Sequence, residues 1–306
     1  MTITVFGSIN IDLTTYSAQL PRPGETLHGQ RYAIGLGGKG CNQAVAASRL
    51  GSKTNLIGRI GQDTFGDTAL AALRRLDVPT DGVFVDPGSD TGVAVIGVDA
   101  RAENCITVIG GANMAIDGTD VARAHSMFEV TDVLLLQMEI PLDAALAAAD
   151  IVRARGGRVI LDPAPAPKGG LAPSILARVD VITPNETETE ALTGLRPTNA
   201  EQAAVAATRI RVDGAQVVVI KLGAEGVYFQ DENGDGFVPP FKVDSVDSVA
   251  AGDCFNGGLA HALADGFALG DAVRFAAACG ALSTTTAGAS DSAPPLADVM
   301  ALLADQ

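Results

Sequence analysis

The chain has 306 residues, of which 47% are hydrophobic and 19% are charged. A chain of this length can bury roughly three quarters of its unfolded surface, so an α/β core forms without disulfides or a structural metal. Lysine and arginine total 21 against 36 acidic residues, a formal net charge of −15. That balance argues against a nucleic-acid backbone or an anionic membrane as partner, because both would need a basic surface. It leaves room for a phosphate ligand, which backbone N–H groups bind without an excess of lysine.

The cysteines and histidines are too scattered for a zinc site, a disulfide scaffold or a Ser-His-Asp triad. The four cysteines contain no C-x-x-C pair, and no two of the three histidines have ligand spacing. The N-terminal Met1–Gly7 segment lacks a basic region followed by a long apolar run, so no signal peptide is predicted. No stretch approaches the ~18 apolar residues of a membrane span. We therefore expect a cytoplasmic protein.

Short β-branched runs alternate with alanine- and leucine-rich segments of helical period, which is typical of a doubly wound α/β sheet. The predicted strands are Ile3–Ile9, Thr54–Ile60, Val133–Met138, Arg158–Asp162, Val179–Ile182 and Val217–Leu222. The predicted helices are Cys41–Leu50, Thr64–Leu76, Leu142–Arg155 and one that begins at Ala251. Most of these strands are nearly continuous apolar runs, as expected for strands covered on both faces.

Two segments, residues 11–36 and 91–110, interrupt this alternation. They contain strand-like pieces at Arg31–Ile34, Gly92–Val98 and Cys105–Ile109, with no room for crossover helices. We predict hairpins that form a small separate sheet, appended to one domain that spans residues 1–306.

The first glycine cluster, Gly35-Leu-Gly37-Gly38-Lys39-Gly40, precedes a predicted helix. It contains G-x-G-x-x-G, but a dinucleotide-binding turn should end the first strand, and here a complete strand and an irregular stretch come before it. No Ser or Thr follows Lys39, so the cluster is not a P-loop either. Two interpretations remain: a turn that allows close packing, or a ligand pocket in which backbone N–H groups, Lys39 and Asn42 bind a polar molecule.

The second cluster runs from Asp247 to Gly258, where a small-residue turn leads into a helix. The backbone N–H groups of Ala251, Gly252 and Asp253 would converge at the positive end of that helix and could hold an oxyanion or a transferring phosphoryl group. Asp253 would then lie close enough to remove a proton from a hydroxyl. The alternative is that Asp253 only caps the helix.

The third cluster is Thr183-Pro-Asn185-Glu186-Thr-Glu188, after a predicted strand. Asn185 and Glu188 share one helical face, and their oxygens suit a hydrated Mg²⁺ ion. The alternative is a capping asparagine with a glutamate favoured by the helix dipole. The stretch Lys221–Gly226 has the strand and glycine turn of a nucleotide loop, but ordinary strand-turn-strand joints are similar.

Taken together, these clusters resemble the ribokinase (PfkB) family of sugar kinases over nearly the whole chain. The segments that carry the resemblance are Gly7–Asp12, Gly37–Ala44, Leu136–Glu139, Thr183–Glu188, Asp247–Gly257 and Gly288–Ser292. The resemblance implies a three-layer α/β/α fold whose small β-sheet is a lid. It also implies ATP-dependent phosphorylation of D-ribose at its 5-hydroxyl, with sugar and ATP as small-molecule partners.

The resemblance assigns the site residues position by position. Asp253 would be the general base, with Ala251 and Gly252 beside it, and Glu188 would orient Mg²⁺ through water. The residues implied to bind the sugar, besides Asp253, are Asn10, Asp12, Gly38, Lys39, Asn42 and Glu139. Those implied to lie against ATP are Asn185, Lys221, Leu222, Gly223, Ala224, Glu225, Gly226 and Gly252.

A potassium ion beside the anion hole is also implied. The carbonyl groups of Val249, Ser283, Thr286 and Gly288 and the side chains of Asp247 and Ser292 would bind it. The neighbouring Cys41 and Cys254 are interpreted as small apolar filler rather than reactive thiols.

Other acceptors and other classes of function remain open. The same chemistry could act on 2-deoxyribose, a ketohexose or a nucleoside. Nucleoside kinases of this family stack the base on apolar and aromatic lid residues, whereas this lid offers only Tyr16 and Tyr32, and the chain has no tryptophan. A sugar-binding protein without activity is disfavoured because Asp253 and Gly252 are intact.

The strand Gly92–Val98 is apolar at both odd and even positions, so both of its faces would present hydrophobic surface. A lid closes over the sugar with one face only, and a large exposed apolar patch usually marks a contact surface. We therefore predict a two-fold homodimer in which the lids pack together, as the resemblance also implies.

Overall fold

The structure is a computed structural model that describes residues 1–101, 103–167 and 169–306. The large sheet is built from β1 (Thr2–Phe6), β4 (Lys53–Gly61), β5 (Gly82–Asp86), β8 (Val133–Leu136), β9 (Arg158–Leu161), β10 (Val181–Ile182), β11 (Val217–Lys221), β12 (Val227–Asp231) and β13 (Gly234–Val238). Within the described residues their spatial order is β13-β12-β11-β10-β9-β8-β1-β4-β5. All neighbours from β11 to β5 are parallel, and only β12 and β13 pair antiparallel. The predicted α/β class is confirmed, with an antiparallel edge that we did not predict.

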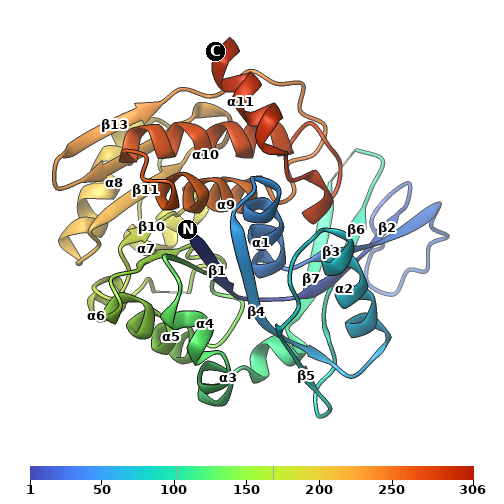
Figure 1. Cartoon of the computed structure of the whole chain (residues 1–306). Coiled ribbons are helices and arrows are strands. Elements are labelled where there is room, and N and C mark those ends of the chain that lie inside the picture. Colours follow the sequence, from blue (N-terminus) through green and yellow to red (C-terminus); the bar gives the residue numbers. More distant parts are fainter. Residues whose placement is uncertain (102, 168) are drawn as a thin grey trace.

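Helices cover both faces of this sheet and make the expected three layers (Figure 1). One layer contains α1 (Lys39–Arg49), α2 (Thr64–Arg75), α9 (Ala251–Ala264), α10 (Leu269–Ser283) and α11 (Leu296–Asp305). The other contains α3 (Gly118–Arg123), α4 (His125–Glu129), α5 (Leu142–Ala154), α6 (Pro173–Leu176), α7 (Glu186–Thr193) and α8 (Ala200–Val212).

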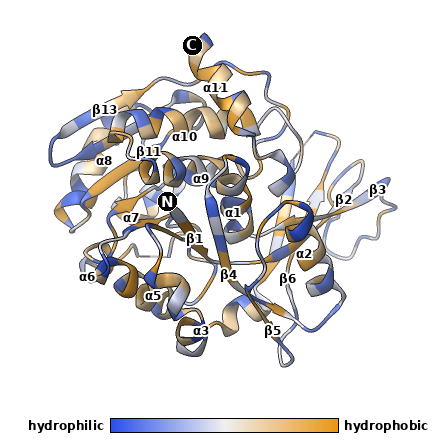
Figure 2. Cartoon of the chain, in the orientation of Figure 1, coloured by the Kyte–Doolittle hydropathy of each residue, from blue (hydrophilic) through white to orange (hydrophobic). Residues whose placement is uncertain are grey.

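The strands are buried because side chains from both of their faces enter a core. In β11, Val219 belongs to the core that contains α9 and α10, whereas Val218 and Ile220 pack with α8. Hydrophobic colour accordingly runs along β1 and β11, and the helices carry both colours (Figure 2). No helix in the described part of the chain combines the length and the apolar character needed to cross a bilayer.

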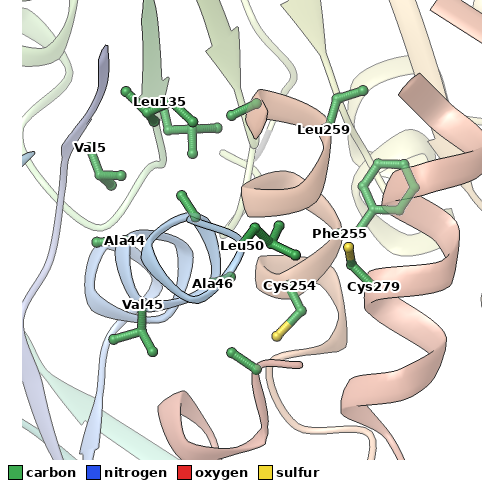
Figure 3. Close-up of a cluster of buried hydrophobic side chains, with 14 of the residues drawn as sticks. Val5, Ala44, Val45, Ala46, Leu50, Leu135, Cys254, Phe255, Leu259 and Cys279 are labelled. Atoms are coloured by element: carbon green, nitrogen blue, oxygen red, sulfur yellow. The ribbon is translucent and has the colours of Figure 1, made fainter. Parts of the chain in front are cut away.

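Close packing of α1, α9 and α10 explains the glycine pair of the second cluster (Figure 3). A Cβ atom at Gly257 would lie 2.6 Å from Ala46 Cβ, and one at Gly258 would lie 2.7 Å from Cys279 Sγ. Cys254 is buried in this contact, and burial raises the pKa of its thiol to about 12. The thiol therefore stays protonated and fills space.

A second sheet contains β2 (Asn10–Tyr16), β3 (Arg31–Gly37), β6 (Gly92–Val98) and β7 (Asn104–Ile109), in the order β3-β2-β6-β7. The predicted small sheet is thus confirmed, and its two antiparallel hairpins are joined by the parallel pair β2–β6. Residue 102, inside the predicted segment 91–110, lies outside the described residues. We missed β2, because four of its seven residues, NIDLTTY, are Asn, Asp or Thr and it does not form an apolar run. The structure instead ends β1 at Phe6 and passes from the large sheet to the small one over residues 7–9.

Candidate active site

The candidate site lies where the carboxyl ends of the central parallel strands meet the small sheet and the N-termini of α1 and α9. In open α/β sheets, this edge is where ligands bind. Chemistry-bearing side chains reach it from several elements: Asp12 from β2, Glu139 after β8, Asp162 after β9, Lys221 from β11 and Asp253 from α9. The three motif clusters, separated in the sequence, therefore converge on one region.

The first glycine cluster brings two backbone segments into contact. Gly38 has φ 90° as the N-cap of α1, and a Cβ there would lie 2.8 Å from the Asn10 nitrogen. A Cβ at Gly40 would lie 2.6 Å from the Gly7 carbonyl carbon. The close-packing interpretation is therefore confirmed, and the ligand-pocket interpretation stays a prediction. The turn permits a close approach that side chains would block, and it places Lys39 at the site. Helix α1 begins at Lys39, two residues before the predicted start.

Asp253 lies in the first turn of α9 but does not cap it. The N-cap is Ala250, at φ 60°, and no side chain caps the helix. The Asp253 carboxylate instead accepts hydrogen bonds from Asn42 Nδ2 at 2.9 Å and from Gln43 Nε2 at 3.1 Å. The capping alternative is therefore wrong, and the carboxylate of Asp253 is held by α1.

The electrostatic environment of Asp253 contains opposing contributions. The residue is 4% exposed, and this burial raises the pKa of its carboxyl group, while the ammonium of Lys39, 3.9 Å away, lowers it. Burial alone would lower the pKa of Lys39, but the carboxylates of Asp253 and Asp162 outweigh it and raise that pKa. Lys39 therefore stays charged beside the carboxylate.

The N–H groups at the start of α9 are only partly free. The Ala251 N–H donates to the Ser248 carbonyl at 3.3 Å. The N–H groups of Gly252 and Asp253, in the first turn, have no carbonyl acceptor within the helix. The predicted anion site therefore has fewer N–H donors than the sequence implied: Gly252 and Asp253 remain as donors, and Ala251 belongs to the turn.

The sugar side of the site combines β2 with the loop after β8. Asn10 accepts a hydrogen bond from Asn113 Nδ2 at 2.8 Å, and Glu139 accepts from Ser8 Oγ at 2.5 Å and from the Lys39 N–H at 3.1 Å. Burial, together with the charges of Glu139 and Asp253, raises the pKa of Asp12 to about 6. Sequence reasoning missed Asn113, which no motif marks.

Small residues surround the polar side chains of β2. Across from Asn10 lie Gly37 on β3 and Gly92 on β6, and across from Asp12 lie Gly35 and Ala94. Facing residues on adjacent strands share one side of a sheet. Two of these glycines make room for the polar side chains themselves: a Cβ at Gly37 would lie 2.1 Å from Asp12 Oδ1, and one at Gly92 would lie 2.1 Å from Asn10 Oδ1.

Asp162 is the most important residue that the sequence analysis did not single out. It is 1% exposed at the end of β9, and it accepts from Lys221 Nζ at 3.1 Å and from Gln43 Nε2 at 3.2 Å. Lys39 Nζ lies 3.8 Å away. We placed Asp162 only as the last residue of a predicted strand, although a carboxylate after an apolar strand is itself a signal for this edge of the sheet.

A cavity of about 850 Å³ opens beside Asp253. Among the residues implied to lie against ATP, those that line it are Asn185, Lys221, Gly223, Ala224, Gly226 and Gly252. The other two differ: the Leu222 side chain is buried in the core with α8, and Glu225 is exposed at the turn. We did not predict the apolar wall that Pro239–Phe241 forms, although the Pro-Pro pair after β13 indicates the end of a strand there.

Asn185 and Glu188 form a reciprocal capping box at the start of α7. Asn185 Oδ1 accepts from the Glu188 N–H at 2.9 Å, and Glu188 Oε2 accepts from the Asn185 N–H at 2.8 Å. The structural alternative is thus correct, yet both residues also line the cavity. Burial and the charge of Asp162 raise the pKa of Glu188 against the opposing effect of Lys221.

The residues implied to hold potassium lie in two segments that Asp247 joins. Its carboxylate accepts from the Val249 N–H at 3.0 Å and from the Gly288 N–H at 2.9 Å. The Ser283 and Ser292 hydroxyl groups donate to the carbonyls of Gly280 and Ala289, at 2.8 and 2.7 Å. These contacts leave the hydroxyl oxygens with free lone pairs.

The chain matches the model of a family described as pfkB family carbohydrate kinase over residues 2–296. A ribokinase from Haemophilus influenzae is 39% identical over 99% of this chain and 98% of its own length. A deoxyribokinase from Salmonella typhi is 36% identical over 97% of this chain and 96% of its own length. The solved structure of Arabidopsis thaliana ribokinase complexed with ribose and ATP covers 98% of both chains, with 31% identity and a TM-score of 0.90.

Proposed function

The chain belongs to the PfkB family of carbohydrate kinases, and we propose that this ATP-dependent sugar kinase phosphorylates D-ribose at its 5-hydroxyl in the cytoplasm. The observation that carries the proposal is the position of Asp253. Its carboxylate lies at the N-terminus of α9, beside the 850 Å³ cavity, and contacts Asn42 and Lys39 from the sugar side. A base between an acceptor pocket and a nucleotide cavity suits in-line phosphoryl transfer.

In the proposed reaction, Asp253 removes the proton of the attacking hydroxyl. The N–H groups of Gly252 and Asp253 stabilise the transferring phosphoryl group at the positive end of α9. Lys39, which stays charged, lies close enough to neutralise part of the developing charge. Phosphoryl transfer demands mainly positioning and charge neutralisation, and these groups supply both.

We assign sugar binding to the polar side chains around Asp253. Asn10 and Asp12 would bind hydroxyl groups beneath the small sheet, and Glu139 and Asn42 would bind others, since each presents oxygen or amide groups at this edge. Gly38 contributes because, without a side chain, it lets the backbone at the start of α1 approach Asn10. The small sheet would act as the lid over this pocket.

ATP would occupy the cavity lined by Asn185, Lys221 and Gly252. Glu188 fits a magnesium ion, because burial and the charge of Asp162 raise the pKa of its carboxyl group, and a bound cation would offset both effects. Both Glu188 oxygens already accept from Asn185, which favours contact with Mg²⁺ through water. When bound, the ion would neutralise phosphate charge.

A potassium ion is proposed beside this anion site. Asp247 would supply the charge and Ser292 a hydroxyl oxygen, with carbonyl groups of Val249, Ser283, Thr286 and Gly288 completing the set. The Asp247 contacts to the Val249 and Gly288 N–H groups support the proposal, because they bring both segments together next to α9.

We further propose a homodimer through the lid. Large apolar side chains are exposed on both faces of the small sheet, which would be unfavourable for an isolated subunit. They are Tyr32, Ile34, Val95, Ile106, Val108 and Ile109. A second copy that packs its own lid against this surface would bury them and would stiffen the cover of the sugar pocket.

The acceptor is tested by steady-state phosphorylation of D-ribose, 2-deoxyribose, D-fructose and adenosine with ATP. We expect the highest kcat/KM with ribose. The deoxyribokinase among the relatives makes 2-deoxyribose the second candidate, and a preference for it would reassign the acceptor. The proposal would be contradicted if the protein phosphorylated none of the four compounds.

A further inference from the structure

Gln43 bridges two buried carboxylates of the site. It lies on α1, is fully buried, and donates from its single Nε2 to Asp253 Oδ1 at 3.1 Å and to Asp162 Oδ2 at 3.2 Å. A glutamine amide carries two N–H groups, so each carboxylate takes one. Nothing in the proposed function has given Gln43 a role.

The orientation of this amide is fixed from its other end. Gln137 Nε2 donates to Gln43 Oε1 at 2.6 Å. A flipped Gln43 would turn its carbonyl oxygen toward two carboxylates and its amino group toward another amino group, so only one orientation forms hydrogen bonds. Within the described residues, Gln137 Oε1 is buried without a hydrogen-bond partner. A buried oxygen without a hydrogen-bond partner lowers the stability of the fold. The same side chain holds Gln43 in place through its Nε2 group.

The bridge also reaches the nucleotide side. Asp162 accepts from Lys221 Nζ at 3.1 Å, and Lys221 lines the nucleotide cavity. A continuous chain of contacts therefore runs from Asp253 through Gln43 and Asp162 to Lys221. It connects the base at the acceptor side to the ammonium group at the ATP side.

We propose that Gln43 is a positioning residue, whose amide aims the carboxylate of Asp253 at the acceptor and keeps Asp162 directed to Lys221. The inference rests on the proposed role of Asp253 as general base. The hydrogen bond from Gln43 to Asp253 favours the ionised form of that carboxylate, so Gln43 keeps the base deprotonated at a lower pH than burial alone would allow.

Other charges act on Asp253 and remain when Gln43 is changed. From α1 come the ammonium of Lys39 and a hydrogen bond from the amide of Asn42, and from the end of β9 comes Asp162, while Glu139 after β8 acts on Lys39 and Asp12. The remaining charged groups that face this cluster are Asp12 on β2, Glu188 on α7 and Lys221 on β11. The thiol of Cys254, next on α9, stays neutral because its pKa is raised to about 12.

The test is the pH profile of kcat/KM for the sugar in Gln43→Met and Gln43→Glu. In Gln43→Met, loss of a donor to the charged form should move the acid limb upward by about one pH unit, as expected for a hydrogen bond to a charged group. Gln43→Glu keeps the shape and adds a third carboxylate, so the limb should move further in the same direction. For both variants, we expect kcat at the pH optimum to fall by a larger factor than the factor by which the KM for ATP changes.

The control is Val45→Ala, which removes buried apolar volume from the same helix without touching either carboxylate. It should lower stability and leave the acid limb unchanged. If Gln43→Met does not fold, the isosteric Gln43→Glu decides. An unmoved acid limb in a folded Gln43 variant would overturn the inference. Near-normal turnover of Asp253→Asn would instead overturn the proposed base, so the two failures are distinguishable.

Discussion

The carboxylates of Asp12, Glu139 and Asp253 interact at the sugar side, and Asp162 and Glu188 interact at the nucleotide side. The ammonium groups of Lys39 and Lys221 face this acidic cluster. Negative charge is therefore concentrated where ligands are expected, and burial makes it costly. The arrangement fits a site completed by a cation and by a substrate rich in hydroxyl donors.

Asp253→Asn should nearly abolish turnover. Positioned proton transfer is worth ~10²–10⁴-fold in rate, and asparagine cannot accept the proton. Sugar and ATP affinity, measured by calorimetry, should be largely kept, because asparagine retains the shape of the side chain. Asp265→Asn, at the exposed C-terminal end of the same helix, is the control and should be fully active. Substantial turnover by Asp253→Asn would refute the assignment.

Asp12 predicts a pH-dependent contribution to stability. Its pKa is raised from 3.8 to about 6, so between these values the folded protein binds more protons than the unfolded chain, and stability falls as pH rises. Asp12→Asn removes this penalty. The variant should gain stability relative to the unchanged protein between pH 4 and pH 7, by up to about 3 kcal/mol, measured by chemical denaturation.

The control for this prediction is Asp63, the N-cap of α2. Hydrogen bonds from the Thr91 and Gly66 N–H groups outweigh burial and lower the pKa of Asp63. A lowered pKa gives stability that is present above 3.8 and lost as pH falls. Asp63→Asn should therefore show the opposite trend. A pH-independent difference for Asp12→Asn would contradict the raised pKa.

At the scale of elements, two helix N-termini define the site. Helix α1 begins at Lys39 because Gly38 takes a backbone conformation open to glycine, and α9 begins after Ala250, a non-glycine residue in the left-handed region. That conformation costs alanine about 1–2 kcal/mol. It turns the chain from the segment that contains Asp247 into α9.

This segment predicts activation by potassium. In a buffer with neither sodium nor potassium, turnover should be low and should rise when potassium is added, because the ion would fix the geometry of the phosphate-binding turn. The comparison uses choline chloride at equal ionic strength as the control. Asp247→Ala should remove the response, since the charge and both N–H contacts are lost. Equal rates with and without potassium would count decisively against the site.

At the scale of the whole molecule, the small sheet is only partly covered, by contacts of α2 with β2 and β3. The large sheet is buried between two helical layers, whereas β7 is exposed along its whole length. Val95 lies on the face of Leu13 and Ile34, and Ile96 lies on the opposite face. Each face therefore presents apolar side chains. The face that carries Ile96 is also the face that carries Asp12. The small sheet would then both close the sugar pocket and form the contact between subunits.

Val95→Asp and Ile96→Asp should each yield monomers with weakened sugar affinity, because a charge cannot be buried between two lids without a partner. Sedimentation at micromolar concentration measures the assembly, and calorimetry measures ribose binding. Val205→Asp, on the exposed side of α8 away from the lid, is the matched control and should remain dimeric. An unchanged protein that sediments as a monomer would refute the lid dimer.

The family and the central parallel strands of the large sheet followed from the sequence alone. Short apolar runs such as Val133–Leu136 and Val217–Ile220 favour strands covered on both faces, and the glycine clusters favour a turn at Gly38 and close helix packing at Gly257 and Gly258. The sequence also placed Asp253 at a helix start. Local chemistry and periodicity decide these features, because both act between residues close in the chain.

Other features were decided only by the tertiary structure. Strand β2 was not predicted, since most of its residues are polar and periodicity does not tell where a chain leaves one sheet for another. The partners of Asp253 lie 211 and 210 residues away, on α1. Asp162 became part of the site only when β9 was paired beside β8 and β10. The charges of buried groups depend on these long-range contacts, because burial and neighbouring charges set each pKa, and neither exists before the chain folds.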